Sequence, residues 1–375
     1  MKTHFITPVW GEKHTKIFID ILLPSLLSPK NIPNLLNLSE YTYYIYTDET
    51  DAIKIKESIE YRHLQSLISV KISLIEEKFK NKNPYIMMSN CHRIGLNIAT
   101  NLNAGAIFIP PDSIWADGSI KNLQNIISSG VTAIHMSMLR IEKKSTFKFV
   151  TNLKQQNNNI YLQITPRDLV KLSLPHLHSI THDHFFKEEN DHGFGLIPSN
   201  LLWDVNNQGI LARCFHLHPI YVKLNKYTQF KSTIDDDLML LLKENIKTHY
   251  IVTDSDEICA FEISPFSHQI NPPCKKQSVS NIARWALHNT NNYHRKLINT
   301  TIRIHHTTIN KKIWAPIEKQ AENTINQYKF LFFLYRFLAI KRIHKILSIC
   351  KLIFYKIYNI LYYEYNKYIS KAKKL

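Results

Sequence analysis

The residue best suited to chemistry is Asp112, an acid that directly follows a short apolar run. The run, Ala106–Ile109, is followed by Pro110 and Pro111. Proline cannot donate a backbone hydrogen bond and has a fixed φ, so we predict a buried strand that ends there. The carboxyl ends of strands in an open α/β sheet form the crevice where ligands bind. Asp112 is therefore predicted to face a metal or a phosphate-bearing ligand, and the alternative is a residue that only shapes the turn.

A second acidic group consists of Asp235, Asp236 and Asp237, which follow Ser232 and Thr233. We predict that this segment starts a helix, with a hydroxyl cap and acids in its first turn. One of the three carboxylates could then take a proton from an attacking hydroxyl. The alternative is that all three only complement the helix dipole.

Histidines form a third group. His216 and His218 lie in the β-rich segment Leu211–Val222. We predict that they share one face of a single strand, because side chains alternate with a period of two. Imidazole and carboxylate ligands together suit Mn²⁺ or Mg²⁺, which would neutralise a diphosphate, and a packed strand face is the alternative. His176 and His178 form a further candidate cluster.

The elements that must position these residues alternate between strand and helix. Short linkers between them favour a mostly parallel open sheet with helices on both faces. Asp117, just after the Asp112 strand, is predicted to cap a helix that ends before Gly130. From residue 276 to about 325 the pattern is helical. The predicted strands are 4–9, 41–47, 69–75, 106–109 and 131–136, and the predicted helices include 51–64, 85–102 and 166–174.

Composition excludes several classes of protein. The 375 residues are 44% hydrophobic and 21% charged, which is typical of a globular protein. No Gly-x-Gly-x-x-Gly or Gly-x4-Gly-Lys pattern is present, so a dinucleotide fingerprint and a P-loop kinase are not expected. The five cysteines are odd in number and widely scattered, which favours reduced thiols in a protein that faces the cytosol. The N-terminal segment is predicted to be a first strand and not a signal peptide.

Positive charge is concentrated at the C-terminal end. The net charge is +17, and residues 326–375, with eleven Lys or Arg and the single acid Glu364, contribute +10 of it. Basic residues interrupt the apolar and aromatic ones, so no run reaches the roughly 18 to 20 uncharged residues of a spanning helix. We predict a basic, aromatic helix pair that binds an anionic membrane surface. Nucleic-acid binding is less favoured, because these aromatics suit a bilayer interface as well as base stacking.

Several motifs in combination resemble the nucleotide-binding half of GT-A-type glycosyltransferases, over roughly residues 3–265. They are Ile6-Thr-Pro-Val-Trp-Gly-Glu12, Tyr46-Thr-Asp48, Met88-Ser-Asn-Cys-His-Arg93, Phe108-Ile-Pro-Pro-Asp112-Ser-Ile-Trp-Ala-Asp-Gly-Ser119 and Ser232-Thr-Ile-Asp-Asp-Asp-Leu238. The family's Asp-x-Asp motif binds a divalent cation on the diphosphate of a sugar nucleotide. Here Pro110 replaces its first acid and Asp112 matches its second.

The resemblance implies a role for each matching residue. Asp112 would bind the diphosphate or its metal, His218 would complete the metal site, and His92 or Arg93 would neutralise the leaving diphosphate. The base of an inverting transfer would be Asp235, Asp236 or Asp237. The nucleotide would contact Thr7, Pro8, Val9, Trp10 and Asp48.

The leading hypothesis is a cytoplasmic glycosyltransferase, peripheral on the inner face of a membrane, that makes a bacterial-type surface glycan or glycolipid. Its donor would be a nucleotide sugar and its acceptor a glycan or lipid-linked hydroxyl. The expected organisation is a GT-A-like catalytic domain (1–270), a helical extension (271–325) and the basic tail (326–375). The alternatives are a non-catalytic protein that binds anionic membranes and a sugar-phosphate nucleotidyltransferase, although Trp10-Gly-Glu-Lys13 matches the loop of the latter poorly.

Overall fold

The computed structural model describes residues 2–76, 83–157, 160–186, 198–229, 233–235, 238, 242, 248–267 and 278–339. The chain divides into two compact units. The first comprises residues 1–277 and 290–322, and the second comprises residues 278–289 and 323–375.

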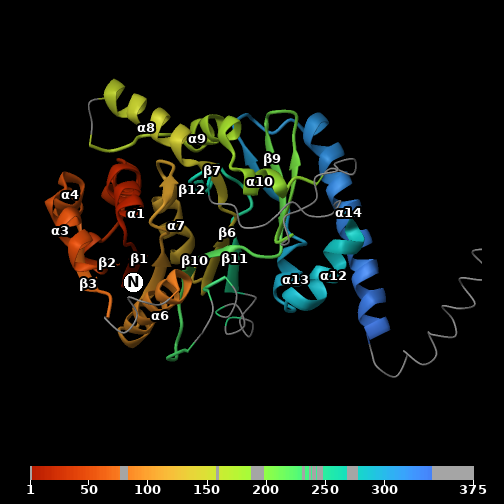
Figure 1. The fold of residues 1–375 in the computed structure, drawn as a ribbon, viewed down its shortest axis with the longest axis horizontal. Coiled ribbons are helices and arrows are strands. Elements are labelled where there is room, and N and C mark those ends of the chain that lie inside the picture. The colour runs from red at the N-terminus through yellow and green to blue at the C-terminus, as the bar shows by residue number, and fades with distance from the viewer. Residues whose placement is uncertain are drawn as a thin grey trace, which may run out of the picture. The chain divides into compact units, whose positions relative to one another are not determined.

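A seven-stranded, mostly parallel sheet forms the centre of the first unit, as the alternating sequence pattern predicts (Figure 1). Its strand order is β11-β6-β10-β4-β1-β2-β3, and β10 runs antiparallel to both of its neighbours. The strands are β1 (Thr3–Pro8), β2 (Tyr41–Thr47), β3 (Ser69–Leu74), β4 (Gly105–Phe108), β6 (Ala133–Met136), β10 (His218–Val222) and β11 (His249–Ile251).

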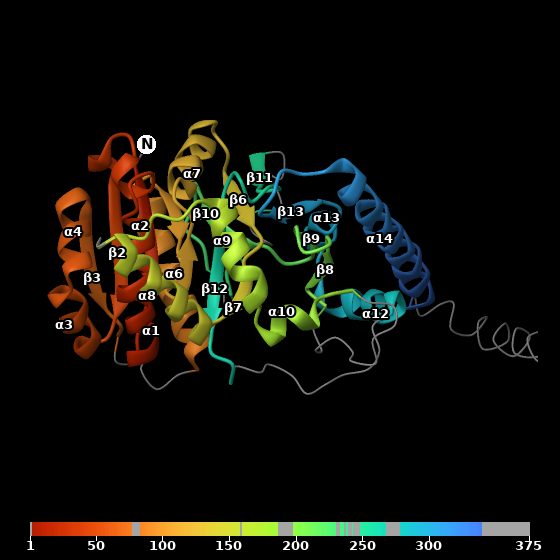
Figure 2. The ribbon, with the colours of Figure 1, turned by 90° about the horizontal axis from the view of Figure 1, so that it is seen from above.

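Helices cover both faces of this sheet because its strands alternate apolar side chains between the faces. Ile6 and Phe108 pack with α6 (Pro84–Asn101) in one core cluster. Phe5 and Ile107, one position away, pack with α7 (Ser119–Ser128) in a second cluster. Figure 2 shows α3 (Glu49–Glu57) and α4 (Ile59–Leu67) beside the edge strand β3. The single helix predicted over 51–64 is thus two helices, separated at Ser58, whose hydroxyl caps α4.

The connection order creates a switch point between β1 and β4. From β1 the chain adds β2 and then β3 on one side, and it returns to place β4 on the other. At such a point the two neighbouring connections diverge, and the crevice between them is where open α/β sheets bind ligands. The sequence segment that ends β4 is the one that carries Asp112.

The turn after β1 leads into a continuous helical segment. Gly11 has a φ of 79°, in the left-handed region that favours glycine, and its N–H donates to the Asp51 carboxylate at 2.6 Å. The segment consists of α1 (Glu12–Ile17), the π-helical η1 (Phe18–Leu22) and α2 (Leu23–Leu26), followed by two 3₁₀ turns, η2 (Ile32–Asn34) and η3 (Leu38–Glu40).

Two small sheets complete the first unit. One has the order β5-β12-β7 and the other β13-β9-β8. Their strands are β5 (Ser113–Trp115), β7 (Leu139–Glu142), β12 (Ala260–Ser264), β8 (Asn200–Asp204), β9 (Gly209–Cys214) and β13 (Ile302–His305). The remaining helices of the unit's described residues are α8 (Lys143–Asn157), α9 (Pro166–Ser173), η4 (Leu174–His176), α10 (Ser179–Asp183) and α13 (His294–Leu297).

Two further predictions about elements are wrong. The segment Leu211–Val222 is not one strand, because β9 ends at Cys214 in a small sheet and β10 begins at His218 in the central sheet. The second error concerns 276–325, predicted to be helical throughout. Its residues Ile302–His305 pair with β9 as a strand, and the alternation of Ile and charged or polar residues there has the period of two that a strand requires.

The second unit contains α12 (Val279–Asn289) and the C-terminal part of α14 (Lys311–Ala339). Ser280 Oγ lies 2.6 Å from the Tyr335 hydroxyl, and the Arg284 guanidinium lies over the Tyr335 ring. These contacts join the two helices within the unit. Across the described residues, no helix has both the length and the apolar character that crossing a bilayer requires.

Candidate active site

Asp112 lies at the switch point, where the ends of β1 and β4 are joined. Thr7 Oγ1 donates to the Ile109 carbonyl at 3.0 Å, and Ile109 N–H donates to the Ile6 carbonyl at 3.1 Å. These bonds fix the chain just before Pro110. The Asp112 carbonyl in turn accepts from Ile263 N–H at 2.6 Å, which connects the turn to β12. The backbone around Asp112 is therefore held from two sides.

Glu262, on β12, is the nearest acidic neighbour that the sheet pairing supplies. It is the β-ladder partner of Ser113 on β5 and of Arg140 on β7. Arg140 Nη2 lies 2.6 Å from Glu262 Oε1, and Arg140 Nη1 donates to Ser264 Oγ at 3.1 Å. An ion pair thus joins the Glu262 side chain on β12 to Arg140 on β7.

The carboxylates of this region act on one another. Burial, opposed by the charge of Arg140 and reinforced by the charges of Asp112 and Asp235, raises the pKa of Glu262 to about 7. Burial also raises the pKa of Asp112, again opposed by Arg140. His14 Nδ1 lies 3.8 Å from Asp112 Oδ2, but partial burial and the charge of Lys143 lower the pKa of this imidazole. The region therefore gathers acidic groups whose ionisation burial disfavours.

His218 opens β10 and faces the end of β4. Its Nε2 lies 3.4 Å from the Phe108 carbonyl. Burial lowers the pKa of His218, against the opposing charge of Asp235, so the imidazole is neutral near pH 7. A neutral imidazole is the form that ligates a metal. His218 therefore lies at the same edge of the sheet as Asp112, as an uncharged nitrogen donor.

Asp235 belongs to the same electrostatic neighbourhood. It lies in a turn, its carbonyl is 3.3 Å from His294 Nε2, and its charge acts on both His218 and Glu262. Asp236 and Asp237 lie outside the described residues. The structure therefore brings Asp112, His218 and Asp235 to one region.

His216 does not share a strand face with His218. It lies in the link between β9 and β10, where its ring is 4.2 Å from that of His294. His178 caps α10, with its Nδ1 accepting from Ile180 N–H, and its Nε2 lies 2.9 Å from the Pro265 carbonyl. These contacts give His178 a structural role.

The residues predicted to contact the nucleotide surround the end of β1. Thr7 and Val9 are fully buried, and the Thr7 hydroxyl also lies 2.8 Å from the Tyr43 hydroxyl, so its side chain faces the interior. Pro8 ends β1 and Trp10 is half-buried. The Asp48 carboxylate accepts from Asp51 N–H at 2.8 Å and caps α3.

Two other predicted roles, those of His92 and Asp117, need correction. His92 is buried on α6, and burial lowers its pKa to about 3, so it carries no charge that could neutralise a diphosphate. Arg93, beside it, donates to Asn90 Oδ1 at 2.5 Å within the helix. Asp117 does not cap α7. It accepts from Ser28 Oγ and Lys30 N–H, and Asn31 Oδ1 instead accepts from the Gly118 and Ile120 amides at the helix start.

Glu262, Arg140 and His14 were not predicted from the sequence. Glu262 and Arg140 alternate with apolar neighbours on short strands, so each has the pattern of an exposed strand residue. Their meeting depends on the pairing of β12 with β7, which joins segments over 120 residues apart. The available signal in the sequence was the alternation Phe261-Glu262-Ile263, which is typical of a strand with Glu262 on the opposite face from its apolar neighbours. The structure shows that both apolar residues are buried.

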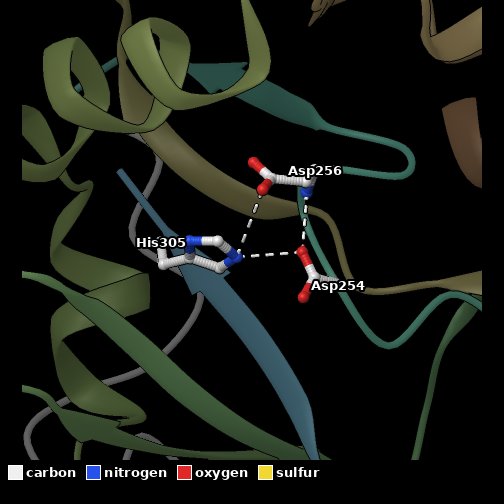
Figure 3. A group of neighbouring side chains, drawn as sticks. All are labelled: Asp254, Asp256 and His305. Carbon is white, nitrogen blue, oxygen red and sulfur yellow. Dashed lines mark hydrogen bonds and ion pairs between the residues drawn. The ribbon is translucent and has the colours of Figure 1, made fainter. Parts of the chain in front are cut away.

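A separate cluster, formed by Asp254, Asp256 and His305, has donor atoms that all lie within 4.8 Å of one another, so it could hold a metal ion (Figure 3). His305 Nε2 lies 2.9 Å from Asp254 Oδ1 and 3.9 Å from Asp256 Oδ2. His305 Nδ1 lies 2.7 Å from the Thr307 carbonyl, and Arg167 makes a forked ion pair with Asp256.

A protonated His305 completes the hydrogen bonds of this cluster without a metal. Both ring nitrogens then donate, and the two carboxylates are balanced by imidazolium and guanidinium. Burial lowers the pKa of His305, but its hydrogen bonds to Asp254 and Thr307 outweigh burial and raise it overall. The bond to His305 lowers the pKa of Asp254. The cluster therefore joins the turn before β12 to β13 as an ion-pair network.

The donors at the switch point suit a divalent cation chemically. Carboxylate oxygens and a neutral imidazole nitrogen form the mixed set that Mn²⁺ accepts. Asp112 and His218 would be the residues to hold it. Such a cation, when bound, would offset the charge of a diphosphate.

Comparison with known proteins finds similarity only at the level of structure. No protein-family model matches the sequence, and no curated protein matches it. Residues amounting to 37% of the chain match 36% of S. aureus TarS 1–349, with 13% identity and a TM-score of 0.26.

Two other glycosyltransferase structures are also similar. The mannosyltransferase PcManGT from Pyrobaculum calidifontis, in complex with GDP-Man and Mn²⁺, matches over 94% of this chain and 80% of its own, with 10% identity and a TM-score of 0.36. Mouse xyloside xylosyltransferase 1 matches over 42% and 60%, with 12% identity and a TM-score of 0.24. Because these TM-scores are low, the geometry of the site carries the functional conclusion.

Proposed function

We propose that this protein is a glycosyltransferase that moves a sugar from a nucleotide-diphosphate sugar to an acceptor hydroxyl. The observation that carries the proposal is the convergence of Asp112, His218, Asp235 and Glu262 at the switch point of a mostly parallel sheet. A nucleotide sugar needs a nucleoside site beside a strand end, a site for the diphosphate, and a base for the acceptor. Each has a candidate at this edge.

The roles follow from the chemistry of the groups. The turn after β1, with Trp10, and Asp48 after β2 would flank the nucleoside. Asp112 and His218 would hold Mn²⁺ or Mg²⁺ against the diphosphate. Asp235, or the neighbouring Asp236 or Asp237, would accept the proton of the acceptor hydroxyl as its oxygen attacks the sugar, which implies inversion. Partial burial strengthens each of these electrostatic interactions.

We also propose that the acceptor is lipid-linked or belongs to a surface glycan, and that the protein works at the inner face of a membrane. Support comes from α14, where Phe330, Phe333 and Phe337 are 67%, 69% and 49% exposed. Their spacing of three and four residues puts them on one helix face. Exposed aromatic side chains beside basic residues suit the interface of an anionic bilayer.

The test of the catalytic proposal is Asp112→Asn. We expect sugar-nucleotide turnover to fall roughly 100-fold or more, because the diphosphate loses a charged ligand of its cation. Asp204→Asn, at an exposed carboxylate on β8, is the matched control and should keep wild-type turnover. Release of nucleoside diphosphate from a panel of nucleotide sugars with Mn²⁺ measures both. Full turnover by Asp112→Asn would refute the site assignment, and vesicle binding without any turnover by the wild type would favour the non-catalytic alternative.

A further inference from the structure

We propose that His294 is a positioning residue for the reaction, because it fixes the backbone of Asp235 through a hydrogen bond to the Asp235 carbonyl. The inference rests on the proposed function, and it takes Asp235 as the base that accepts the proton of the acceptor hydroxyl. It gives a role to a histidine of α13 that lies 59 positions after Asp235 in the sequence.

The turn that carries Asp235 packs against α13. Because Asp235 lies in a turn, its position depends on contacts with other segments. The preceding residue, Ile234, is buried in the same apolar cluster as Tyr293 and Leu297, which lie at the two ends of α13. The Asp235 carbonyl oxygen lies 3.3 Å from His294 Nε2. Apolar packing therefore brings the turn to α13, and a polar contact fixes it there.

Two backbone groups determine the tautomer and the direction of the His294 ring. Asn291 N–H donates to His294 Nδ1 at 3.4 Å, and a backbone N–H can only donate, so Nδ1 carries no proton. The proton of the neutral imidazole is therefore on Nε2, which donates to the Asp235 carbonyl. Burial, aided by the neighbouring His216, lowers the pKa of His294 to about 4. At pH 7 the ring is thus a neutral donor with a fixed direction.

The segment that carries His294 is bonded to the central sheet. The Asn291 carboxamide oxygen accepts from the Tyr293 and His294 amides at 2.7 and 3.0 Å, which fixes the start of α13. The Tyr293 hydroxyl lies 2.8 Å from His135 Nε2 on β6 and 2.7 Å from His249 Nδ1 on β11. Both strands belong to the seven-stranded sheet. A series of hydrogen bonds therefore connects this sheet to the His294 ring.

The position of a base matters most in the chemical step. A general base must lie within hydrogen-bond reach of the proton that it takes, and a displacement of about 1 Å can cost roughly 100-fold in rate. His294 acts on Asp235, whereas Asp112, His218 and the turn after β1 would bind the donor. Loss of the His294 bond should therefore lower kcat and leave the KM for the nucleotide sugar unchanged.

The test variant is His294→Phe in the full chain, which keeps an aromatic ring against His216 but neither donates nor accepts a hydrogen bond. With Mn²⁺ present, we expect kcat for release of nucleoside diphosphate from a nucleotide sugar to fall roughly 10- to 100-fold. The KM should stay within about twofold of the wild-type value. His294→Gln, whose amide offers both a donor and an acceptor, should restore kcat to within about threefold of wild type.

His178→Phe is the matched control. His178 is also buried, and its Nδ1 accepts from Ile180 N–H while its Nε2 lies 2.9 Å from the Pro265 carbonyl. Its ring therefore has the same two kinds of bond, in a different part of the unit. We expect a lower melting temperature with kcat within about twofold of wild type. If melting shows that His294→Phe is unfolded, His294→Leu, which is smaller and lacks the same two bonds, takes its place.

Hydrogen exchange of the backbone amides around Asp235, followed by mass spectrometry, measures the positioning without turnover. We expect faster exchange in His294→Phe than in wild type and unchanged exchange in His178→Phe. Unchanged exchange in His294→Phe, a kcat within about twofold of wild type, or a loss of kcat that His294→Gln does not restore would each refute the positioning role alone. Faster exchange in His294→Phe, together with no turnover by wild type, would support the fixing of Asp235 and refute the proposed function alone.

Discussion

Glu262 illustrates how ionisation of a partly buried carboxyl group lowers the stability of a fold. In water a glutamate is ionised at neutral pH, whereas here burial and two neighbouring acids raise its pKa to about 7. Between pH 4.5 and 7 the folded state therefore binds more protons than the unfolded chain. By linkage, ionising Glu262 in this range weakens folding, and the free energy of unfolding falls as the pH rises.

Glu262→Gln should therefore gain stability relative to wild type as the pH increases. We expect the difference in free energy of unfolding to shift in favour of the variant by roughly 1 to 3 kcal/mol between pH 5 and pH 8, with solvent screening reducing the upper value. Chemical denaturation at both pH values, without metal, measures it. A difference that stays constant with pH would show that Glu262 ionises as it does in water.

His305 has the opposite dependence on pH. Its pKa is raised above 6.5 by Asp254 and the Thr307 carbonyl, so its contribution to stability is fully present below pH 6.5 and is lost as the pH rises through the folded-state pKa. The pKa of Asp254 is lowered below 3.8, so its contribution to stability is fully present above pH 3.8 and is lost as the pH falls through the folded-state pKa. The network of Figure 3 is therefore strongest between these limits.

His305→Gln should lower the free energy of unfolding mainly at acidic pH. We expect a loss of about 1 kcal/mol at pH 5.5 and a smaller loss at pH 9, because the wild-type imidazolium is then deprotonated. Melting temperatures at the two pH values, without added metal, measure the difference. His306→Gln, at the neighbouring half-buried imidazole outside the ion-pair network, is the control.

The two kinds of site residue differ in how far the sequence predicts them. Asp112 follows a strand and two prolines, so a local pattern suffices. The link between Glu262 and Arg140 depends on ladder register between distant strands, which no local pattern contains. His92 was predicted to carry a charge because it lies in the motif Met88–Arg93, which resembles a GT-A motif. Its ring is buried against Phe108, and burial is a property of tertiary packing.

At the scale of elements, the link of three residues between β9 and β10 determines where His218 lies. Phe215 and Leu217 are buried, and apolar residues predominate in the segment 211–222, so it has the composition of one long strand. The chain nevertheless changes sheets at this link. Sequence periodicity predicts that both halves are strands, which is correct, but it contains no information on which partner each half takes. That choice brings His218 to β4 and separates it from His216.

Gly209, at the start of β9, permits the close pairing of β9 with β13. A Cβ atom added there would lie 2.1 Å from the Ile304 carbonyl oxygen and 2.8 Å from His305 Cα, both backbone atoms. Gly209→Ala should therefore force the strands apart and destabilise the protein by about 1 to 3 kcal/mol. Gly130→Ala is the comparison, because a Cβ atom there would have no atom within 4 Å, whereas the φ of 88° disfavours alanine. Its loss of stability therefore measures backbone strain without a steric clash. Equal losses in the two variants, measured by urea denaturation, would contradict the argument from contact.

At the scale of the whole molecule, the charge is divided unequally along the chain. Residues 326–375 supply +10 of the net +17. Alternation of strands and helices in the sequence correctly predicts the mostly parallel sheet, because that pattern repeats over many residues. The pairing within the two small sheets was not predictable, since their strands are short and come from distant segments.

The proposed membrane association predicts binding that depends on both charge and aromatic residues. We expect the protein to float with vesicles containing about 30% phosphatidylserine and to dissociate as the salt concentration rises from about 0.1 to 1 M, where the Debye length falls from about 10 to 3 Å. Replacing Phe330, Phe333 and Phe337 by Ser should weaken binding at low salt. Ile59→Ser, at a side chain 57% exposed on α4, is the control. Equal flotation with uncharged phosphatidylcholine vesicles would contradict an electrostatic role.

The antiparallel strand β10 also determines when the protein can fold during synthesis. It lies between β4 and β6, yet the ribosome makes it more than 80 residues after β6 begins. Until then β4 and β6 cannot be joined, and each presents an unpaired strand edge that can associate with other chains. Glu262 emerges later still. The nascent chain therefore completes its central sheet, and after it the strand β12 that carries Glu262, only when more than two thirds of the polypeptide has been translated.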